Sequence, residues 1–569
     1  MEQRRFLLAM VLSAIVILVW QFFFAPPIEP PTEDRSQEIV AQQEDRPSEA
    51  TQQERAPDGT AEESDLPAME SDRDDEEVVQ APAIEERIDR IITPELTVVL
   101  SNRGAVVRST KITAPRQYAG VGGRLMRAFQ DDSPAWPFEL SFVDQNIELT
   151  GDEMFEFVES ESILSPDGES YSKITYRYRD PRNRFIVDKI YAADPDRQYV
   201  IRLDIAVQNL LEDMRLVDTA ALDIIGRDDP DKKRPRFDFR PDVLGAACQT
   251  TDKTHREQFE RLDGRITHSQ HSVIWAAAET RYFMMAAAPE NGADACIFEA
   301  AGEDYLRTRI VHERFSIEPG DTWVAGHTLF IGPKDFDVLR DTGHRFEEAV
   351  DYGFFTILAR PLRRILVIFH GFVGNWGLAI ILLTLLIKGA TWRITGKAYE
   401  NAERMKLIQP QIKEIREKYE KDQQRMTEET MKAFKENNVS PLGCLPLLLQ
   451  MPILYGLFVM IYNSVEIYQA NFLWYTDLSA PDPIFLLPIV MGVVMFIQQR
   501  LTMQSSAATM NPQMVTVMKI MPVMFTAFML FLPAGLVLYY LLNLLLGLAQ
   551  QFMIKRRYAV AEETGEAAA

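Results

Sequence analysis

The chain of 569 residues predicts a polytopic α-helical membrane protein with a large extracytoplasmic β domain. Two observations carry this prediction. Apolar runs of about 20 residues, the length that crosses a bilayer, stand near the N-terminus and again in the last third of the sequence. Between them lies a long polar region with short alternating runs, which are typical of strands. We expect six transmembrane helices, five of which form a core.

The first expected segment is an N-terminal anchor over residues 1–25. Arg4 and Arg5 precede an apolar run, and no Ala-x-Ala cleavage site follows it. This pattern favours an uncleaved signal anchor over a cleaved signal peptide. Because positively charged flanks stay in the cytoplasm, we expect the N-terminus on that side.

Residues 26–90 form an acidic linker. This segment holds 21 Asp and Glu against 6 Arg, a net charge of 6 − 21 = −15 out of −23 for the whole chain. It is rich in Pro, Gln, Ser and Ala and nearly free of aromatic residues, so it cannot bury enough apolar surface to fold. We expect a disordered tether, extended by its like charges.

Residues 91–349 are expected to form a periplasmic β-sandwich. Period-two runs rich in Val, Ile, Tyr and Phe predict strands, for example over residues 95–100, 171–178 and 184–191. Cys248 and Cys296 both lie in this region. A disulfide between them is possible if the region is exported, but their spacing does not decide whether they pair.

Residues 350–373 predict an amphipathic helix that lies in the membrane interface. Arg360, Arg363 and Arg364 are three and four residues apart, which places them on one face, with apolar residues largely elsewhere. A spanning helix would bury three arginines, so the interfacial placement is favoured.

Apolar runs return over residues 374–557, where we expect the five-helix core. Its spans are predicted at residues 376–395, 442–465, 484–498, 515–532 and 534–552. A charged helical hairpin over residues 397–440 carries ten Lys and Arg, whereas the loop over residues 466–483 has none. The positive-inside rule therefore places the hairpin and the C-terminus in the cytoplasm. Residues 558–569 form a short acidic tail.

Polar side chains inside the apolar runs are the candidate site. Lys388 and Thr384 share a helix face because they are four residues apart, and a cation at such depth in a membrane is usually functional. If the polar faces converge, they form a hydrophilic pocket at the cytoplasmic side. The alternative is that Lys388 snorkels over ~10 Å to the cytoplasm and the others pack. The candidate substrate-binding residues are Thr384, Lys388, Gln450, Tyr539, Tyr540 and Asn543.

No catalytic, cofactor or metal site is expected, and we predict that the chain is not an enzyme. His268 and His271 could approach one metal ion, but no third ligand is in view. Two other classes stay open. A transporter or channel would show solute flux and often paired repeats, and a carbohydrate-active periplasmic enzyme would need an acid/base pair and would leave the helical core unexplained.

The chain resembles the YidC/Oxa/Alb family of membrane protein insertases, in its Gram-negative form. The resemblance covers essentially the whole chain. Its most specific stretches are FVGNWG at residues 372–377, NVSPLGCLP at 438–446, LQMP at 449–452 and FLPAGLVLYY at 531–540.

The resemblance implies a membrane protein insertase and chaperone of the bacterial inner membrane, with a periplasmic β-supersandwich. It implies a hydrophilic groove, open to the cytoplasm and lipid, with Lys388 at the position of the charged groove residue and Thr384 and Tyr540 as substrate contacts. The implied partners are nascent membrane proteins, the ribosome, the Sec translocon and membrane lipid, without nucleic-acid specificity.

Two departures from the family pattern matter. The groove residue is usually Arg, and Lys can lose its proton when buried whereas Arg effectively cannot. The tail is acidic, whereas family members with basic tails use them towards the ribosome. The expected mechanism is that Lys388 attracts a polar substrate segment, while a wet groove lowers its desolvation cost and the hydrophobic helix partitions into lipid.

Overall fold

The computed structural model describes residues 84–115, 118, 133–164, 170–228, 243–262, 264–420, 422–439, 445–503 and 512–564. All of these belong to one compact unit, Gln80–Ala569. The expected N-terminal anchor, most of the acidic linker, Cys444 and the end of the tail lie outside the described residues.

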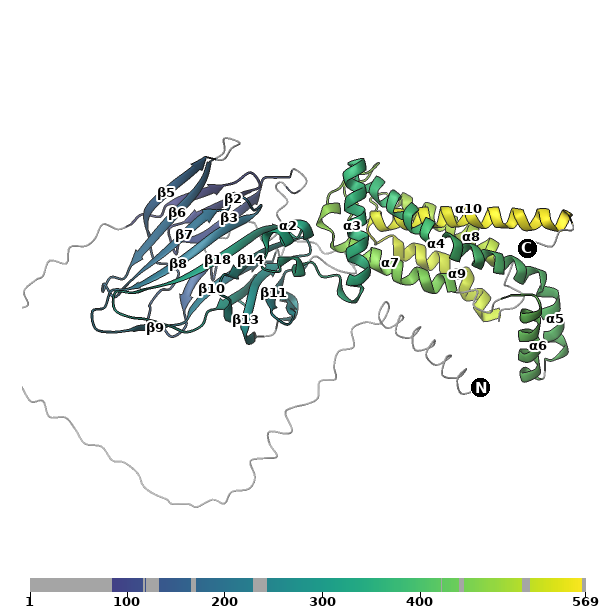
Figure 1. Ribbon diagram of the computed structural model, residues 1–569, viewed down its shortest axis with the longest axis horizontal. Coiled ribbons are helices and arrows are strands. Elements are labelled where there is room, and N and C mark those ends of the chain that lie inside the picture. The colour runs from purple at the N-terminus through teal and green to yellow at the C-terminus, as the bar shows by residue number, and fades with distance from the viewer. Residues whose placement is uncertain are drawn as a thin grey trace, which may run out of the picture. The chain divides into compact units, whose positions relative to one another are not determined.

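The β domain occupies the first half of the described chain (Figure 1). Its strands are β1 (Ile88–Ile92), β2 (Leu96–Ser101), β3 (Val106–Ile112), β4 (Glu139–Phe142), β5 (Glu156–Leu164), β6 (Ser170–Arg179), β7 (Phe185–Ala193), β8 (Val200–Asn209), β9 (Leu216–Asp218), β10 (Ala220–Arg227), β11 (Gly245–Thr250), β12 (Thr254–Gln258), β13 (Arg265–Glu279), β14 (Phe283–Pro289), β15 (Ala293–Ala300), β16 (Tyr305–Val311), β17 (Phe315–Ile317) and β18 (Thr322–Pro333). The strands predicted near residues 95, 171 and 184 are confirmed as β2, β6 and β7.

One antiparallel sheet of 13 strands dominates the domain. Its main path runs β4-β10-β16-β15-β13-β14-β18-β8-β7-β6-β5, with β11 paired to β13 and β12 to β11. A separate sheet of β1, β2 and β3 covers part of it, and the Tyr191 hydroxyl of β7 donates 2.8 Å to the carbonyl of Ala105 beside β3. Val98 and Leu100 of β2 share a buried cluster with Tyr191. This layering confirms the predicted β-sandwich.

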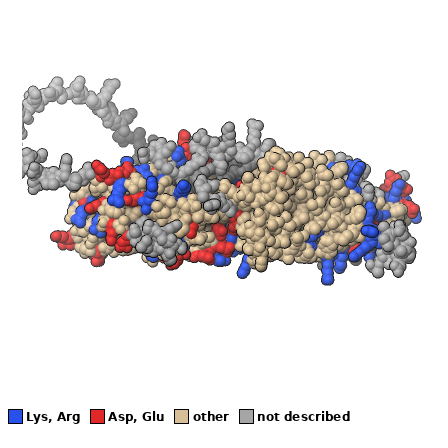
Figure 2. All heavy atoms as spheres, turned by 90° about the horizontal axis from the view of Figure 1, so that it is seen from above, with Lys and Arg blue, Asp and Glu red and all other residues tan. Residues whose placement is uncertain are grey.

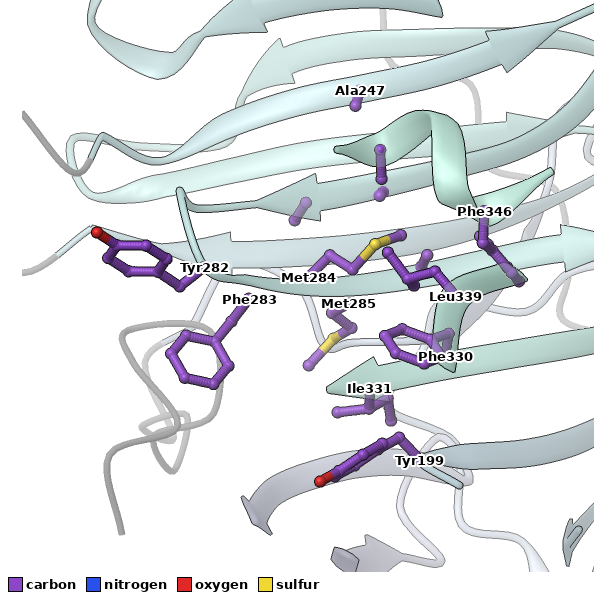
Figure 3. Packing of buried hydrophobic residues seen from close by; sticks show 14 of the residues in the cluster. Tyr199, Ala247, Tyr282, Phe283, Met284, Met285, Phe330, Ile331, Leu339 and Phe346 are labelled. Carbon is purple, nitrogen blue, oxygen red and sulfur yellow. The ribbon is translucent and has the colours of Figure 1, made fainter. Parts of the chain in front are cut away.

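Helical segments close one region of the large sheet. The side chain of Asp335 caps α2 (Phe336–Thr342) by accepting from the backbone N–H of Asp337 at 2.9 Å. Figure 3 shows Leu339 of α2 and Phe346 of η3 (Phe346–Ala349) packed among the side chains of β14 and β18. The rings of Phe330 and Phe346 lie 5.9 Å apart. Burial of this apolar surface is the main stabilisation of the domain.

Cys248 of β11 and Cys296 of β15 form a disulfide, which settles the question that spacing left open. Both residues are fully buried, and both strands pair with β13. The disulfide closes a loop with a sequence separation of 48 residues.

The helical region follows the β domain. Its elements are η4 (Gly353–Phe355), α3 (Thr356–Val373), α4 (Trp376–Leu407), α5 (Gln409–Lys418), α6 (Gln423–Glu436), α7 (Leu445–Asn463), η5 (Val465–Ile467), α8 (Leu486–Met503), α9 (Pro512–Met529) and α10 (Ala534–Thr564); η2 (Phe259–Arg261) lies in the β domain. The first core span was expected to end near residue 395, but α4 continues to Leu407 because no proline interrupts it. Pro410 then stands in the first turn of α5, where proline is favoured.

The arginines of α3 differ in their burial. Arg363 is buried, with 6 % of its surface exposed, whereas Arg364 is exposed. Nε of Arg363 donates 2.6 Å to Glu466 of η5, and its guanidinium lies 3.1 Å from Asp337 of α2. The predicted arginine face is therefore present, since all three arginines line one cavity, but Arg363 is buried because acids from two other elements draw it inward.

Arg363 stays charged in this environment. Burial lowers the pKa of Arg363, but the carboxylates of Glu466, Asp337 and Asp335 outweigh burial and raise it overall. Burial raises the pKa of Glu466 to about 7, and Arg363 opposes that rise. Both pKa values are thus raised, which favours the charged form of Arg363 and the protonated form of Glu466. The short contacts support a permanently charged arginine that holds the nearby carboxylates.

Further contacts join the β domain to η5 and the segment after it. The Tyr118 hydroxyl donates 3.0 Å to the carbonyl of Val465. The rings of Tyr282 and Tyr468 lie 4.6 Å apart. Together with Arg363, these contacts anchor the sheet on the loop between α7 and α8.

Two helices, Trp376–Leu407 and Ala534–Tyr558, are long and apolar enough to cross a membrane, and Leu486–Leu501 and Lys519–Met529 are shorter apolar helices. Figure 2 shows a broad surface over this region without charged side chains, with Lys and Arg gathered beyond one end of it. Such a surface is typical of a lipid-facing band. The total of six crossings stays a prediction.

Candidate functional site in the helical core

Polar residues form a stripe along α4 and another along α10. Residues three or four positions apart lie on one helix face. The polar stripe of α4 contains Thr384, Lys388, Thr391, Thr395 and Tyr399, and the stripe of α10 contains Tyr539, Asn543, Gly547 and Gln550.

The first polar contact lies near the beginning of α10. Tyr539 is buried, with 1 % of its surface exposed. Nε2 of Gln450 donates 2.9 Å to the Tyr539 hydroxyl, which ties α7 to α10. The neighbouring Tyr540 turns its ring towards Phe525 of α9, with 5.1 Å between the ring centroids. Tyr539 thus makes a hydrogen bond between helices, whereas Tyr540 makes an aromatic contact.

Thr384 is satisfied within its own helix. Its hydroxyl donates 2.7 Å to the carbonyl of Ile380, one turn earlier in α4. The side chain is buried, with 1 % exposed. Asn543 is half-buried on α10. In this conformation, Thr384 presents no free donor to a substrate.

Lys388 lies where α4, α8 and α10 meet. Its side chain is buried, with 5 % exposed. A β-carbon at Gly547 would lie 3.5 Å from Nζ of Lys388. The same β-carbon would lie 3.0 Å from the Tyr399 hydroxyl and 3.4 Å from Nε2 of Gln498. The absent side chain of Gly547 therefore leaves the space in which three polar groups come together.

No counter-ion balances Lys388 among the described residues. Its ammonium takes part in no described ion pair or hydrogen bond, whereas the nearby Gln498 donates 3.4 Å to the Tyr399 hydroxyl. An unbalanced cation in an apolar surrounding costs several kcal/mol unless water or a ligand meets it. This cluster of Lys388, Tyr399, Gln498 and Gly547 is called the lysine cluster below.

One turn further along α10, Gln550 bridges the two helices. Its Nε2 donates 2.8 Å to the carbonyl of Trp392, and its Oε1 accepts from the Thr395 hydroxyl at 2.9 Å. These bonds hold α4 against α10 at the level where α4 leaves its apolar stretch, so they position the lysine cluster.

The other ends of α4 and α10 are covered by the loop between α7 and α8. A β-carbon at Gly377 would overlap the ring of Phe472, so the ring rests directly on that glycine. A β-carbon at Gly535 would lie 3.3 Å from the carbonyl of Leu478. The two glycines allow the loop to seat closely on the helix ends.

The predicted site residues do not form a single constellation. Gln450 and Tyr539 meet, but Lys388 lies beside Gly547, eight residues or about 12 Å along α10 from Tyr539. Sequence reasoning missed the partners Tyr399, Gln498 and Gln550. Tyr399 continues the three-and-four spacing of α4 beyond Lys388, and Gln550 continues that of α10, so extending the stripes would have found both. Gln498 had no such signal, because it comes from a third helix.

Metal binding gains no support from the described part of the chain, where no group of three or more His, Cys, Asp and Glu is placed to hold an ion. The side chains of His268 and His271 lie outside the described residues.

Comparison with known proteins covers both halves of the chain. The sequence model of the YidC periplasmic domain matches residues 89–365, and that of the 60Kd inner membrane protein matches residues 368–562. A membrane protein insertase YidC from Syntrophus aciditrophicus (strain SB) is 30 % identical over 566 residues, covering 97 % of this chain and 99 % of the relative. One from Geobacter sulfurreducens is 31 % identical over 479 residues, covering 83 % and 86 %.

Among solved structures, an active YidC insertase is similar with a TM-score of 0.35 and 18 % identity, covering 81 % of this chain and 91 % of that one. The sequence relatives, matched almost end to end, decide the assignment. The chain belongs to the YidC family of membrane protein insertases.

Proposed function

We propose that this insertase passes polar segments of nascent inner-membrane proteins along α4 and α10, with the lysine cluster as the point of contact. The observation that carries the proposal is Lys388, buried with 5 % exposed and without a counter-ion among the described residues. An acidic or polar substrate segment would supply the missing partner, which lowers the free energy of both groups.

The proposed hydrophilic path is short, because α4 and α10 are polar over only part of their length. Tyr399, Gln498 and Gln550 extend the hydrophilic surface from Lys388 towards the end of α4. The hydrophobic helix of the substrate leaves sideways into lipid, driven by apolar burial. No step requires a cofactor or bond chemistry.

The proposed topology has six crossings, with both termini in the cytoplasm and the β domain in the periplasm. The proposed partners are the ribosome, at the cytoplasmic hairpin of α5 and α6, and the Sec translocon for substrates that need both. Lys and Arg gathered beyond one end of the uncharged surface support the orientation (Figure 2).

The test is reconstitution of the purified full chain in liposomes with a small one-span or two-span substrate made in vitro. Protease-protected substrate, absent from empty liposomes, is the readout. Lys388→Met is expected to lower insertion of a substrate with an acidic translocated segment by about fivefold or more, because it removes a charge interaction of at least ~1 kcal/mol. Lys388→Arg should retain most of the activity.

Lys519→Met is the matched control, because Lys519 is an exposed lysine of α9. It should insert the substrate like the unchanged protein. Equal activity of Lys388→Met and Lys519→Met would show that insertion does not need the charge of Lys388, and it would leave the insertase function itself unaffected. No insertion by the unchanged, correctly oriented protein would point to dependence on the Sec translocon.

A further inference from the structure

A cavity of about 620 Å³ lies between α2 and α3. Four arginines line it, together with a single carboxylate from Asp337. The arginines are Arg340, Arg360, Arg363 and Arg364. A cavity with this lining is suited to a group that carries negative charge and several acceptor oxygens, since guanidinium groups bind such groups with paired hydrogen bonds.

Protein acids use only part of the donor capacity of these arginines. The guanidinium of Arg363 forms ion pairs with Glu466 and Asp337. Arg360 donates one nitrogen to Glu348 at 3.1 Å, but its Nε is buried without an acceptor in the described structure.

The remaining two arginines face outward. Arg340 lies 3.1 Å from Asp337 and 3.2 Å from Asp341, and its side chain is 55 % exposed. Arg364 is exposed and pairs with no described acid. An external anion would therefore find open donors on Arg364, with the exposed Arg340 in the same lining.

The surface beside the cavity is apolar and exposed. On α3, Ile357 is 89 % exposed, Ile368 is 50 % exposed and Phe372 is 81 % exposed. The spacing of residues 357, 361, 364, 368 and 372 places them on one face, with Arg364 in the middle. An amphipathic helix of this kind lies in a membrane interface with its apolar residues among the acyl chains, and an arginine in the stripe extends its charge to the headgroups.

We propose that the cavity binds the phosphate of an anionic phospholipid, whose acyl chains cover the stripe of Ile357, Ile368 and Phe372. A free phosphate ion would satisfy the arginines but would leave that stripe in water. The combination of arginine donors with an adjoining apolar stripe favours the lipid. The inference rests on the proposed placement of α3 at the outer surface of the membrane.

The experiment is native mass spectrometry of the full chain in neutral detergent, with phosphatidylglycerol and phosphatidylcholine added in equal amounts. We expect one phosphatidylglycerol molecule to be retained at least about fivefold better than phosphatidylcholine. Arg364→Gln and Arg340→Gln should each lower that retention by up to about fivefold, the usual effect of one arginine at an anionic surface. Arg314→Gln is the control, because Arg314 is an exposed arginine that pairs with Asp144 in the β domain.

Ile357→Ser provides a second test that leaves the charges unchanged, and its exposure makes misfolding of the variant unexpected. It should lower retention of both lipids. Equal retention of the two lipids by the unchanged protein would overturn the proposal, as would unchanged retention in both arginine variants. Displacement of the lipid by millimolar inorganic phosphate would assign the cavity to a free anion instead. Loss of lipid preference with normal insertion separates this inference from the proposed function.

Discussion

At the scale of single residues, Gly547 has as large a part in the candidate site as Lys388. A β-carbon at Gly547 would be tight against the Tyr399 hydroxyl, at 3.0 Å, and would touch Gln498 and Lys388 at ordinary contact distances. At Gly389, next to Lys388 in sequence, a β-carbon would meet no atom within 4 Å beyond its own chain neighbours and the nearby backbone of its helix. The two glycines therefore separate the effect of space in the cluster from that of helix propensity.

We expect Gly547→Ala to lower insertion by about fivefold, because the new methyl group crowds the Tyr399 hydroxyl of the lysine cluster at a cost on the order of 1 kcal/mol. Gly389→Ala should leave insertion unchanged. The measurement is the amount of protease-protected substrate in proteoliposomes at equal amounts of insertase. Equal activities of the two variants would show that the cluster tolerates a methyl group and that its spacing is not critical.

A pair of histidines sets a pH dependence in the β domain. Nε2 of His312 lies 2.9 Å from Nε2 of His327, and both side chains are buried. Burial lowers the pKa of His312 from 6.5 to about 4. Burial and the charge of His312 lower the pKa of His327 further below its ordinary value. Both rings are therefore neutral in the folded domain at pH 7.

The domain should lose stability as the pH falls from about 6.5 towards 4. In that window the unfolded chain binds protons that the folded domain excludes, so the free energy of unfolding falls by up to about 1.4 kcal/mol per pH unit for each histidine. Thermal unfolding of the protein and of a His312→Phe/His327→Leu variant at pH 7.5 and pH 5 measures the difference. A variant that loses as much stability as the unchanged protein would contradict the assignment.

At the scale of elements, the alternation and helical spacing of apolar residues predicted which strands and helices form better than how these elements pair. The runs in β2, β6 and β7 were found because one face of each strand is buried and the other is not. The order of the 13 strands could not be predicted, since β18 pairs with β8 and β14 through residues far apart in sequence. Arg363 was misplaced for the same reason: its partner Glu466 lies 103 residues away.

The pairing of Cys248 with Cys296 is an element-scale feature with a measurable effect. A double Cys→Ala variant should lower the free energy of unfolding of the β domain by about 2–4 kcal/mol, because the loop of 48 residues is no longer closed in the unfolded chain. Denaturant unfolding under oxidising and reducing conditions measures this. If reductant destabilised the double variant as much as the unchanged protein, the effect would not come from this disulfide.

At the scale of the whole molecule, Arg363 of α3 joins Asp337 of α2, beside the large sheet, to the buried Glu466 of η5. Arg363→Met is expected to lower the free energy of unfolding by about 3–5 kcal/mol, because it leaves the carboxyl group of Glu466 buried without its cation. An Arg363→Met/Glu466→Gln variant should recover much of the loss, and Arg364→Met should have little effect because Arg364 is exposed.

Thermal unfolding of the detergent-solubilised full chain checks these three variants. A double variant no more stable than Arg363→Met alone would mean that the guanidinium acts through Asp337 or Asp335 rather than through Glu466. The comparison therefore identifies which acid depends on the arginine.

The ring of Phe472 on Gly377 has a consequence for the energy supply of the cell. A bacterial membrane stores free energy as an ion gradient, and a standing aqueous leak would discharge it. Constrictions lined by apolar groups stop ions by excluding water. In the proposed orientation, the aromatic ring and the Leu478 segment seal the outer ends of α4 and α10. A polar inner half can thus coexist with a bilayer that remains electrically tight.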